Sequence, residues 1–326
     1  MGITFRTAGC ALLSSMLLTG CGSGDKPDKH VEYAVQGAYS AAISPSARFA
    51  ALGSFNHGGS LWNIQQHERL YNWNHKAGDY SIIAASAFSP DELYAATANQ
   101  QDLVLWNLSN GQPEGFWSSP AEILGMDLSA NGDYALLGLA DHTAVYFDVK
   151  NGGVMQTFRH DARVKAVDLS GDALLALTGS DAYNATLWDV QGNKVLHSIK
   201  FGNVVDTVAL SPNNQLAFSS GSLDRAVIWS TQTGETLHTL SDNRDLFGKR
   251  LSFLSARFSP DSSQLLTGSA SGSVQLWDAA SGDLLRSWEI HRRDPYGPTS
   301  TGAYALGFGE GTYYALGSNG ILNELK

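Results

Sequence analysis

Downstream of residue 30, apolar residues alternate with polar ones in short runs, and tight-turn residues separate these runs. No segment in this part keeps a clear apolar period of about 3.6 residues over three helical turns. Turns such as SPD at 89–91 and at 259–261 precede groups of runs; their proline presets the backbone angle and Asp closes the turn. The pattern therefore predicts an all-β chain of many short strands.

A pair formed by an aromatic and a polar residue recurs at intervals of 41 to 48 residues. A turn that begins with Ser stands ahead of each pair, a small-residue step such as Gly-Ser at 268–269 lies between them, and a second turn follows. Apolar alternation beside each pair indicates strands buried between neighbouring sheets. We therefore expect four short strands in each repeat. The pairs are Trp62-Asn63, Trp106-Asn107, Phe147-Asp148, Trp188-Asp189, Trp229-Ser230 and Trp277-Asp278.

This repeat resembles that of the WD40 family over residues 31–326, with the Trp-Asp dipeptide intact at 188–189 and 277–278. The resemblance implies a β-propeller, in which four-stranded sheets form the blades of a closed ring. It also implies a polar tetrad that joins a histidine to an aspartate in each blade. Here the histidine is missing from most repeats, so we expect incomplete tetrads and blades held mainly by tryptophan packing. The candidate aspartates are Asp102, Asp141 and Asp224, and the candidate histidines are His75 and His160.

The ends of the chain set the blade count. Residues 31–326 number 296, about 42 for each of seven blades, which matches the length of a WD40 repeat. The C-terminal segment 302–326 provides only three strands, and Glu324 stands where a seventh Trp would be expected. Segment 31–36 has no blade of its own. We therefore predict a seven-bladed WD40-type β-propeller in which 31–36 pairs with the C-terminal three strands and covers both open sheet edges.

The first 20 residues form a predicted signal peptide. Arg6 precedes an apolar run at 8–18, and eleven helical residues span only about 16 Å, well short of a hydrocarbon core of about 30 Å. The run ends in LTGC at 18–21, which resembles a bacterial lipobox. That resemblance implies cleavage before Cys21 and a lipid anchor on this residue. An ordinary secretory leader that ends near a cysteine is the alternative.

Residues 21–30 are polar and rich in Gly and Pro, so we expect a lipidated cysteine followed by a flexible tether. Two or three acyl chains would hold the protein stably to a membrane. Gly22 stands where an aspartate would favour retention in the inner membrane. We therefore expect a bacterial membrane lipoprotein that faces the periplasm, with the outer membrane favoured.

Charge and cysteine content exclude several classes of function. The net charge is −10, and removal of the leader takes away Arg6, which leaves −11. Such a surface repels phosphates, so we expect no nucleic-acid partner. Cys10 and Cys21 are the two cysteines, so the propeller has none for a disulfide or a thiolate site. Histidines are scattered and catalytic motifs are absent, so we expect no enzyme activity, no cofactor and no metal.

Alignment of the first strand of each repeat places Ala42, Ala87, Asp127, Asp168, Ala209, Arg257 and Gly307 at one equivalent position. First strands line the channel of a propeller, so we expect Asp127, Asp168 and Arg257 near it. They could form a polar or ion-binding channel. The favoured interpretation is that they hydrogen-bond within or between blades, as buried charges must.

Three long loops connect successive repeats, at 72–81, 241–250 and 289–302. The charges of these loops largely cancel, and aromatic residues together with Arg are typical of protein interfaces. We therefore predict that the loops form a protein-binding face. The alternative is that they are variable, solvated loops without a function. The candidate partner-binding residues are Trp73, Tyr80, Arg244, Phe247, Lys249, Arg250, Arg292, Arg293 and Tyr296.

The leading functional hypothesis is a monomeric, lipid-anchored, periplasm-facing scaffold that binds an envelope protein of unknown identity. The alternative is a cofactor- or metal-binding enzymatic propeller that resembles quinoprotein or lyase propellers. It would use Asp127, Asp168 and Arg257, with His57 and His160 at the channel mouth. The propeller lipoprotein of the outer-membrane barrel assembly machinery offers a functional analogy only, because that family has a different repeat and eight blades.

Overall fold

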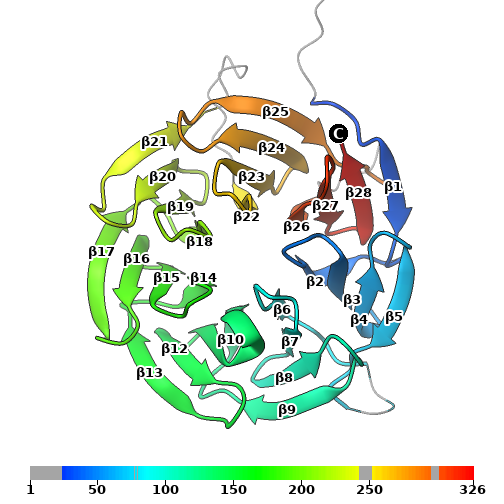
Figure 1. Ribbon diagram of the computed structural model, residues 1–326, viewed down its shortest axis with the longest axis horizontal. Helices are drawn as coiled ribbons and strands as arrows, with labels where there is room; N and C mark the ends of the chain where they lie inside the picture. The colour runs from blue at the N-terminus through cyan, green and yellow to red at the C-terminus, as the bar shows by residue number, and fades with distance from the viewer. Residues whose placement is uncertain (1–23, 77, 79, 242–251, 295–300) are drawn as a thin grey trace, which may run out of the picture.

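A computed structural model of the protein describes residues 24–326 except 77, 79, 242–251 and 295–300. Within these residues, 28 strands form seven four-stranded antiparallel sheets, which stand as blades around a central channel (Figure 1). The predicted seven-bladed all-β propeller is therefore confirmed.

Each of blades 1 to 6 contains four consecutive strands, ordered from the channel outward. Blade 1 contains β2 (Ala38–Ile43), β3 (Phe49–Ser54), β4 (Gly58–Asn63) and β5 (Glu68–Asn72); blade 2 contains β6 (Ala85–Phe88), β7 (Tyr94–Ala98), β8 (Asp102–Asn107) and β9 (Pro113–Ser118); blade 3 contains β10 (Ile123–Leu128), β11 (Tyr134–Leu139), β12 (Thr143–Asp148) and β13 (Val154–Arg159). Blade 4 contains β14 (Val164–Leu169), β15 (Leu175–Ser180), β16 (Asn184–Asp189) and β17 (Lys194–Lys200); blade 5 contains β18 (Val205–Leu210), β19 (Leu216–Gly221), β20 (Ala226–Ser230) and β21 (Thr236–Leu240); blade 6 contains β22 (Phe253–Phe258), β23 (Gln264–Ser269), β24 (Ser273–Asp278) and β25 (Leu284–Glu289).

Blade 7 closes the ring. It contains β26 (Ala303–Phe308), β27 (Tyr313–Gly317) and β28 (Ile321–Leu325), and β1 (Lys29–Glu32) supplies its outermost strand. The closing strand therefore lies two to four residues before the predicted 31–36. The ladder with β28 ends at Glu32, because Tyr33 instead donates its N–H to the Gly320 carbonyl in the turn before β28 at 2.8 Å, while its ring stacks on Trp62 of blade 1 at 4.3 Å.

Part of the predicted tether is also bound to the ring. Asp25 donates its backbone N–H to the Ser287 carbonyl at 2.8 Å and accepts from the Glu289 N–H at 2.9 Å. Asp28 donates its N–H to the Glu324 carbonyl at 2.9 Å. These bonds continue the edge pairing of β1 toward β25, so the described residues 24–30 lie along blades 6 and 7.

Tryptophans hold the blades together, as expected. Trp73 of blade 1 stacks on Trp106 of blade 2 at 5.2 Å, and the Trp106 indole donates to Thr97 Oγ1 at 2.8 Å. His75 Nε2 contacts the same hydroxyl at 2.9 Å, whereas His160 only packs edge-on against the Trp188 ring. Only one of the two candidate histidines therefore joins a hydroxyl of the tetrad type.

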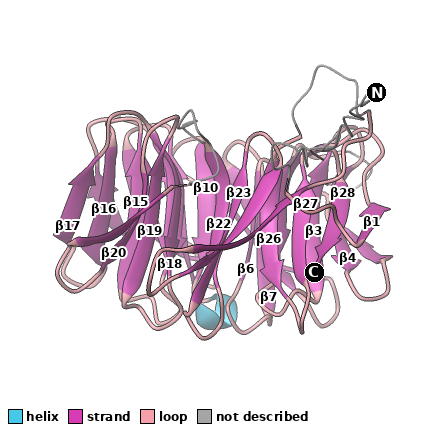
Figure 2. Cartoon of the chain, turned by 90° about the horizontal axis from the view of Figure 1, so that it is seen from above, coloured by secondary structure: helices cyan, strands magenta, loops and turns pink. Residues whose placement is uncertain are grey.

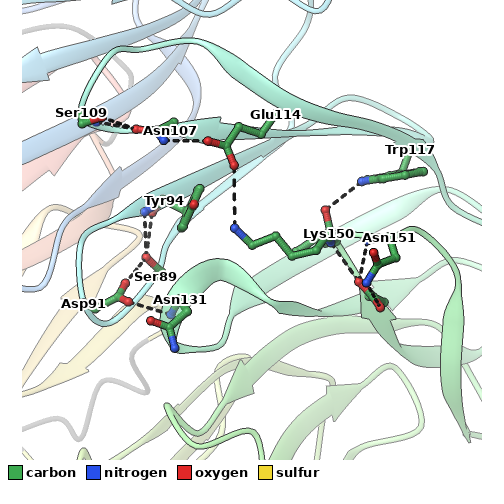
Figure 3. A network of polar contacts seen from close by, with 12 residues as sticks. Ser89, Asp91, Tyr94, Asn107, Ser109, Glu114, Trp117, Asn131, Lys150 and Asn151 are labelled. Atoms are coloured by element: carbon green, nitrogen blue, oxygen red, sulfur yellow. Dashed lines mark hydrogen bonds and ion pairs between the residues drawn. The ribbon is translucent and has the colours of Figure 1, made fainter.

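One face carries the turns between the first and second strands, including the single described helical turn, η1 (Ala130–Gly132), and we call it the lower face (Figure 2). Each turn is a small polar unit. In blade 2, Ser89 Oγ accepts the Tyr94 N–H at 3.0 Å and donates to Asp91 at 2.6 Å. Asp91 in turn accepts the Asn131 N–H of blade 3 at 2.7 Å (Figure 3). Lower-face turns therefore join neighbouring blades.

Candidate functional site

The central channel encloses about 720 Å³ and is lined by the first strands of all seven blades. Asp127, Asp168 and Arg257 lie in its wall, at the position that alignment of the first strands predicts. Each is only partly accessible from the channel. The lower end of the channel therefore contains the three charged side chains, and the question is whether they are free to bind a ligand.

Hydrogen bonds between blades use both carboxylates. Asp127 Oδ2 accepts the Leu169 N–H of the next blade at 2.9 Å, and Asp168 Oδ2 accepts the Leu210 N–H of the blade after that at 2.6 Å. The two aspartate side chains also hydrogen-bond to each other. These contacts match the favoured interpretation of the pair as a link between blades.

Arg257 extends the same link across the ring closure. Its Nη1 donates to the Ile43 carbonyl of blade 1 at 2.5 Å and to the Leu306 carbonyl of blade 7 at 3.1 Å. Gly307, at the equivalent position of blade 7, has no side chain, so Arg257 can reach past it to blade 1. One guanidinium thus connects three blades.

Burial and the charge of Arg257 act in opposite directions on the pKa values of Asp127 and Asp168. Burial raises the pKa of Asp168 well above its ordinary range, and the neighbouring Asp127 carboxyl raises it further. Burial also raises the pKa of Asp127, while the Arg257 guanidinium lowers the pKa of both aspartates. Burial therefore disfavours the ionised form of both carboxyl groups, and the positive charge of Arg257 opposes this effect.

The opposite, upper end of the channel is different, because large apolar side chains are exposed there. Tyr39 packs edge-on against Phe55 with ring centroids 4.1 Å apart, and Tyr80 lies 6.1 Å from the His57 ring. Tyr80, Ile82 and Tyr39 are 66%, 60% and 46% exposed. Tyr39, Leu254 and Tyr304 line the channel at this end, and Phe55 packs on Tyr39. The exposed Val35, Tyr80 and Ile82 belong to the upper-face loops that precede β2 and β6. We name these seven residues of the upper face the mouth arc.

Charged residues occupy the facing side of the upper mouth. Asp181 binds Arg163 at 2.8 Å and Lys165 at 3.1 Å. Burial raises the pKa of Asp206, and Lys165 opposes this effect. We name Arg163, Lys165, Asp181 and Asp206 the charged arc. The upper mouth therefore presents an apolar side and a polar side to the same opening.

Eight of the nine residues predicted to bind a partner fall into three groups. Tyr80 lies in the mouth arc. Arg292 and Arg293 lie on the outer edge, where Arg292 pairs with Glu289 at 3.6 Å and Arg293 donates to the Ala34 carbonyl at 2.7 Å. The following lie outside the described residues: Arg244, Phe247, Lys249, Arg250 and Tyr296.

The prediction for Trp73 is wrong. Its side chain is fully buried, and its indole donates to the Gly111 carbonyl of blade 2 at 3.3 Å. Trp73 follows directly after β5, so in sequence it looks like the start of an exposed loop. In the structure it is instead a contact between blades 1 and 2.

Most mouth-arc residues are absent from the predicted set, although the aligned first strands contain a signal for three of them. Three positions before the aligned channel residues stand Tyr39, Leu254 and Tyr304 of the apolar side and Lys165 and Asp206 of the charged side. All of them line the upper mouth. The alignment therefore defines two rings of side chains, one at each end of the channel.

Among the residues that the structure describes, no three His, Cys, Asp or Glu side chains come together in a group that could hold a metal ion. The described ranges contain no helix with the length and apolar character needed to cross a bilayer. Cys21, the predicted lipid attachment site, lies outside the described residues.

The family model of the WD domain, G-beta repeat, matches residues 235–278. This segment contains β21, the last strand of blade 5, and then β22, β23 and β24 of blade 6. It thus spans one repeat whose first strand completes the preceding blade, just as β1 completes blade 7. No curated protein matches the chain.

Proposed function

We propose that this WD40-repeat β-propeller is a lipid-anchored, periplasm-facing scaffold whose mouth arc binds another protein of the bacterial envelope. WD40 propellers are typically protein-interaction scaffolds and are generally not catalytic. The mouth arc carries the proposal, because it presents exposed tyrosines and aliphatic side chains on the upper face, and three of its members, Tyr39, Leu254 and Tyr304, line the channel there. Clustered exposed apolar residues are a usual mark of a binding surface.

The chemistry of the upper mouth favours a protein segment as the partner. Tyr39 and Tyr80 offer large rigid rings, which supply contact area at a low cost in side-chain entropy. An apolar or aromatic side chain of the partner would cover these rings. The charged arc would then meet the partner's polar groups, and complementarity there would select the partner more than strengthen the complex.

Anchorage is the second part of the proposal. The leader, its short apolar run and the LTGC sequence at 18–21 support acylation of Cys21. The net charge of −11 after the leader disfavours nucleic acid as a partner. The enzymatic alternative receives no support from the channel, because Asp127, Asp168 and Arg257 are engaged in bonds between blades.

Site-specific crosslinking in intact cells tests the binding surface. A photoreactive amino acid at position 82 of the full chain should give a discrete crosslinked species, whereas the same group at position 155 should not. Met155 is a matched control, because it is 56% exposed but lies on β13 at the outer edge. Loss of the species from position 82 in a Tyr39→Ser, Tyr80→Ser variant would support the mouth arc. Equal crosslinking from both positions would contradict it.

Fractionation tests anchorage separately. The Cys21→Ala variant should move from the membrane fraction to the soluble fraction, because the thiol that would carry the acyl chains is gone. The mass of the N-terminal peptide of the parent protein should show the added lipid. An unmodified Cys21 in membrane-extracted protein would contradict the anchor and leave the mouth arc as a separate question.

A further inference from the structure

The ring is fixed to its own N-terminal segment from Gly24 onward. The backbone of Gly24 approaches β25 so closely that a Cβ atom there would lie 2.8 Å from the Ser287 carbonyl carbon. Asp25 then forms an ion pair with Arg286 at 3.2 Å, and Asp28 forms one with Lys326 at 2.7 Å. Backbone bonds and ion pairs together therefore attach residues 24–28 to blades 6 and 7.

This attachment leaves very little chain between the predicted lipid site and the ring. Cys21 and Gly24 are separated by three Cα–Cα steps, so they lie at most about 11 Å apart. A loose tether that reached Val31 would allow about 35 Å over ten steps. The headgroup layer of a bilayer is roughly 5–8 Å thick on each side. An acyl anchor on Cys21 would thus hold the edge of the ring at the membrane surface.

Charge on this part of the edge fits the same placement. We define the closure sector as residues 24–32, 284–294 and 321–326. It contains six Lys or Arg and six Asp or Glu, so its formal charge is zero. The chain after the leader has a net charge of −11, so all of this excess lies outside the closure sector. Because screening at physiological salt acts over about 8 Å, a bilayer beside the closure sector would meet mainly neutral surface.

From these observations, and resting on the proposed acylation of Cys21, we infer that the closure sector lies against the lipid headgroups and the ring stands on its edge. The outer strands β1 and β25 form this edge (Figure 1). Edge-on contact leaves both ends of the channel open to the periplasm. The mouth arc would then be free to receive a soluble segment of a partner while the anchor sets its height above the membrane.

Fluorescence quenching by labelled lipid tests this orientation. The acylated full-length protein, with its lipid verified by mass, is reconstituted into phosphatidylcholine vesicles that carry a headgroup quencher. Because acylation consumes the Cys21 thiol, the propeller offers no competing cysteine for labelling. A fluorophore is placed through Lys26→Cys in the closure sector or through Lys194→Cys on β17. Both lysines are exposed and lie at outer edges of the ring.

The label at position 26 should be quenched several-fold more than the label at position 194. Insertion of about fifteen Gly and Ser residues between Ser23 and Gly24 should bring the two values together, because such a chain has a root-mean-square length of about 20 Å. Equal quenching before insertion, or an unchanged difference after it, would overturn the inference. Absence of lipid on Cys21 would instead contradict the proposed anchor, so the two failures are distinguishable.

Discussion

The two ends of the channel are built from the same seven strands but from opposite kinds of contact. At the lower end, Asp127, Asp168 and Arg257 satisfy one another and the backbone of neighbouring blades. At the upper end, Tyr39 and Leu254 leave large apolar surfaces in solvent. Polar groups that are bonded across blades stabilise the ring, whereas exposed apolar groups add little to its stability. Substitutions at the lower end should therefore change folding, and substitutions at the upper end should change binding.

The largest expected effect is at Arg257. The Arg257→Met variant removes the donor to blades 1 and 7 and leaves the aspartate pair without its counter-charge. Loss of one partner of a buried charge group typically costs about 3–5 kcal/mol. We expect the free energy of unfolding, measured by urea titration, to fall by this amount.

Lys165→Met is the matched control at the upper end of the same channel. The Lys165 side chain is 37% exposed, and exposed ion pairs contribute about 0–1 kcal/mol. If both variants lost the same stability, the contrast between the two ends would disappear. A stable Arg257→Met protein would show that the guanidinium is dispensable for ring closure.

The next effect concerns the proton on Asp168. Its pKa is higher in the folded protein than in the unfolded chain, so the folded state holds an extra proton, and stability falls as pH rises from about 4 toward the folded pKa. Asparagine can still accept from the Leu210 N–H and can donate to Asp127 without titrating. We expect Asp168→Asn to remove the part of this pH dependence that Asp168 causes, while Asp127, whose pKa burial also raises, keeps its own part. The variant should be more stable than the parent at pH 7, by about 1.4 kcal/mol for each unit by which the pKa of Asp168 is raised.

Unfolding curves between pH 4 and pH 8 check this expectation. The difference in stability between Asp168→Asn and the parent should widen toward high pH. Glu122→Gln, an exposed substitution on the upper face, serves as the control for loss of one carboxylate. If the difference in stability between the two proteins were the same at every pH in this range, the pKa of Asp168 would not be raised by folding.

How far the sequence predicts these features depends on how local their causes are. Blades, turns and the channel position of Asp127 follow from repeats of about 42 residues, because each four-stranded unit depends mostly on nearby residues. The bounds of the closing strand are set by β28 and by the Gly320 turn at the far end of the chain, so segment 31–36 alone does not reveal them. The sequence predicts Trp73 in an exposed loop, because the residues that bury it, Trp106 and Gly111, belong to the next repeat. Three mouth-arc residues, Tyr39, Leu254 and Tyr304, stand three positions before the aligned channel residues, and the prediction did not consider that second aligned position.

A smaller effect is expected at the lower-face turns. Burial raises the pKa of Asp91, but hydrogen bonds from Ser89, Leu93 and Asn131 outweigh it, so the pKa lies below its ordinary value. Loss of a bond between blades typically costs about 0.5–1.5 kcal/mol. We expect Asp91→Ala to lower the melting temperature modestly at pH 7. The cost should shrink as pH falls through the Asp91 pKa, which is the opposite sign from Asp168. A cost that grew in acid would contradict this account of the turn.

The smallest effect on stability, and the sharpest on function, is expected at Tyr80. Its side chain is 66% exposed, so Tyr80→Ser should change the free energy of unfolding by no more than about 0.5 kcal/mol. Crosslinking from position 82 should nevertheless fall several-fold, because aromatic anchors dominate interface energies. Tyr80→Phe should keep most of the crosslink, since the ring supplies the contact. Phe116→Ser removes an aromatic that is 55% exposed on the outer strand β9 and should change neither quantity. If Tyr80→Ser unfolded the ring or left the crosslink intact, the upper mouth would not be a binding surface that is separate from the structural lower end.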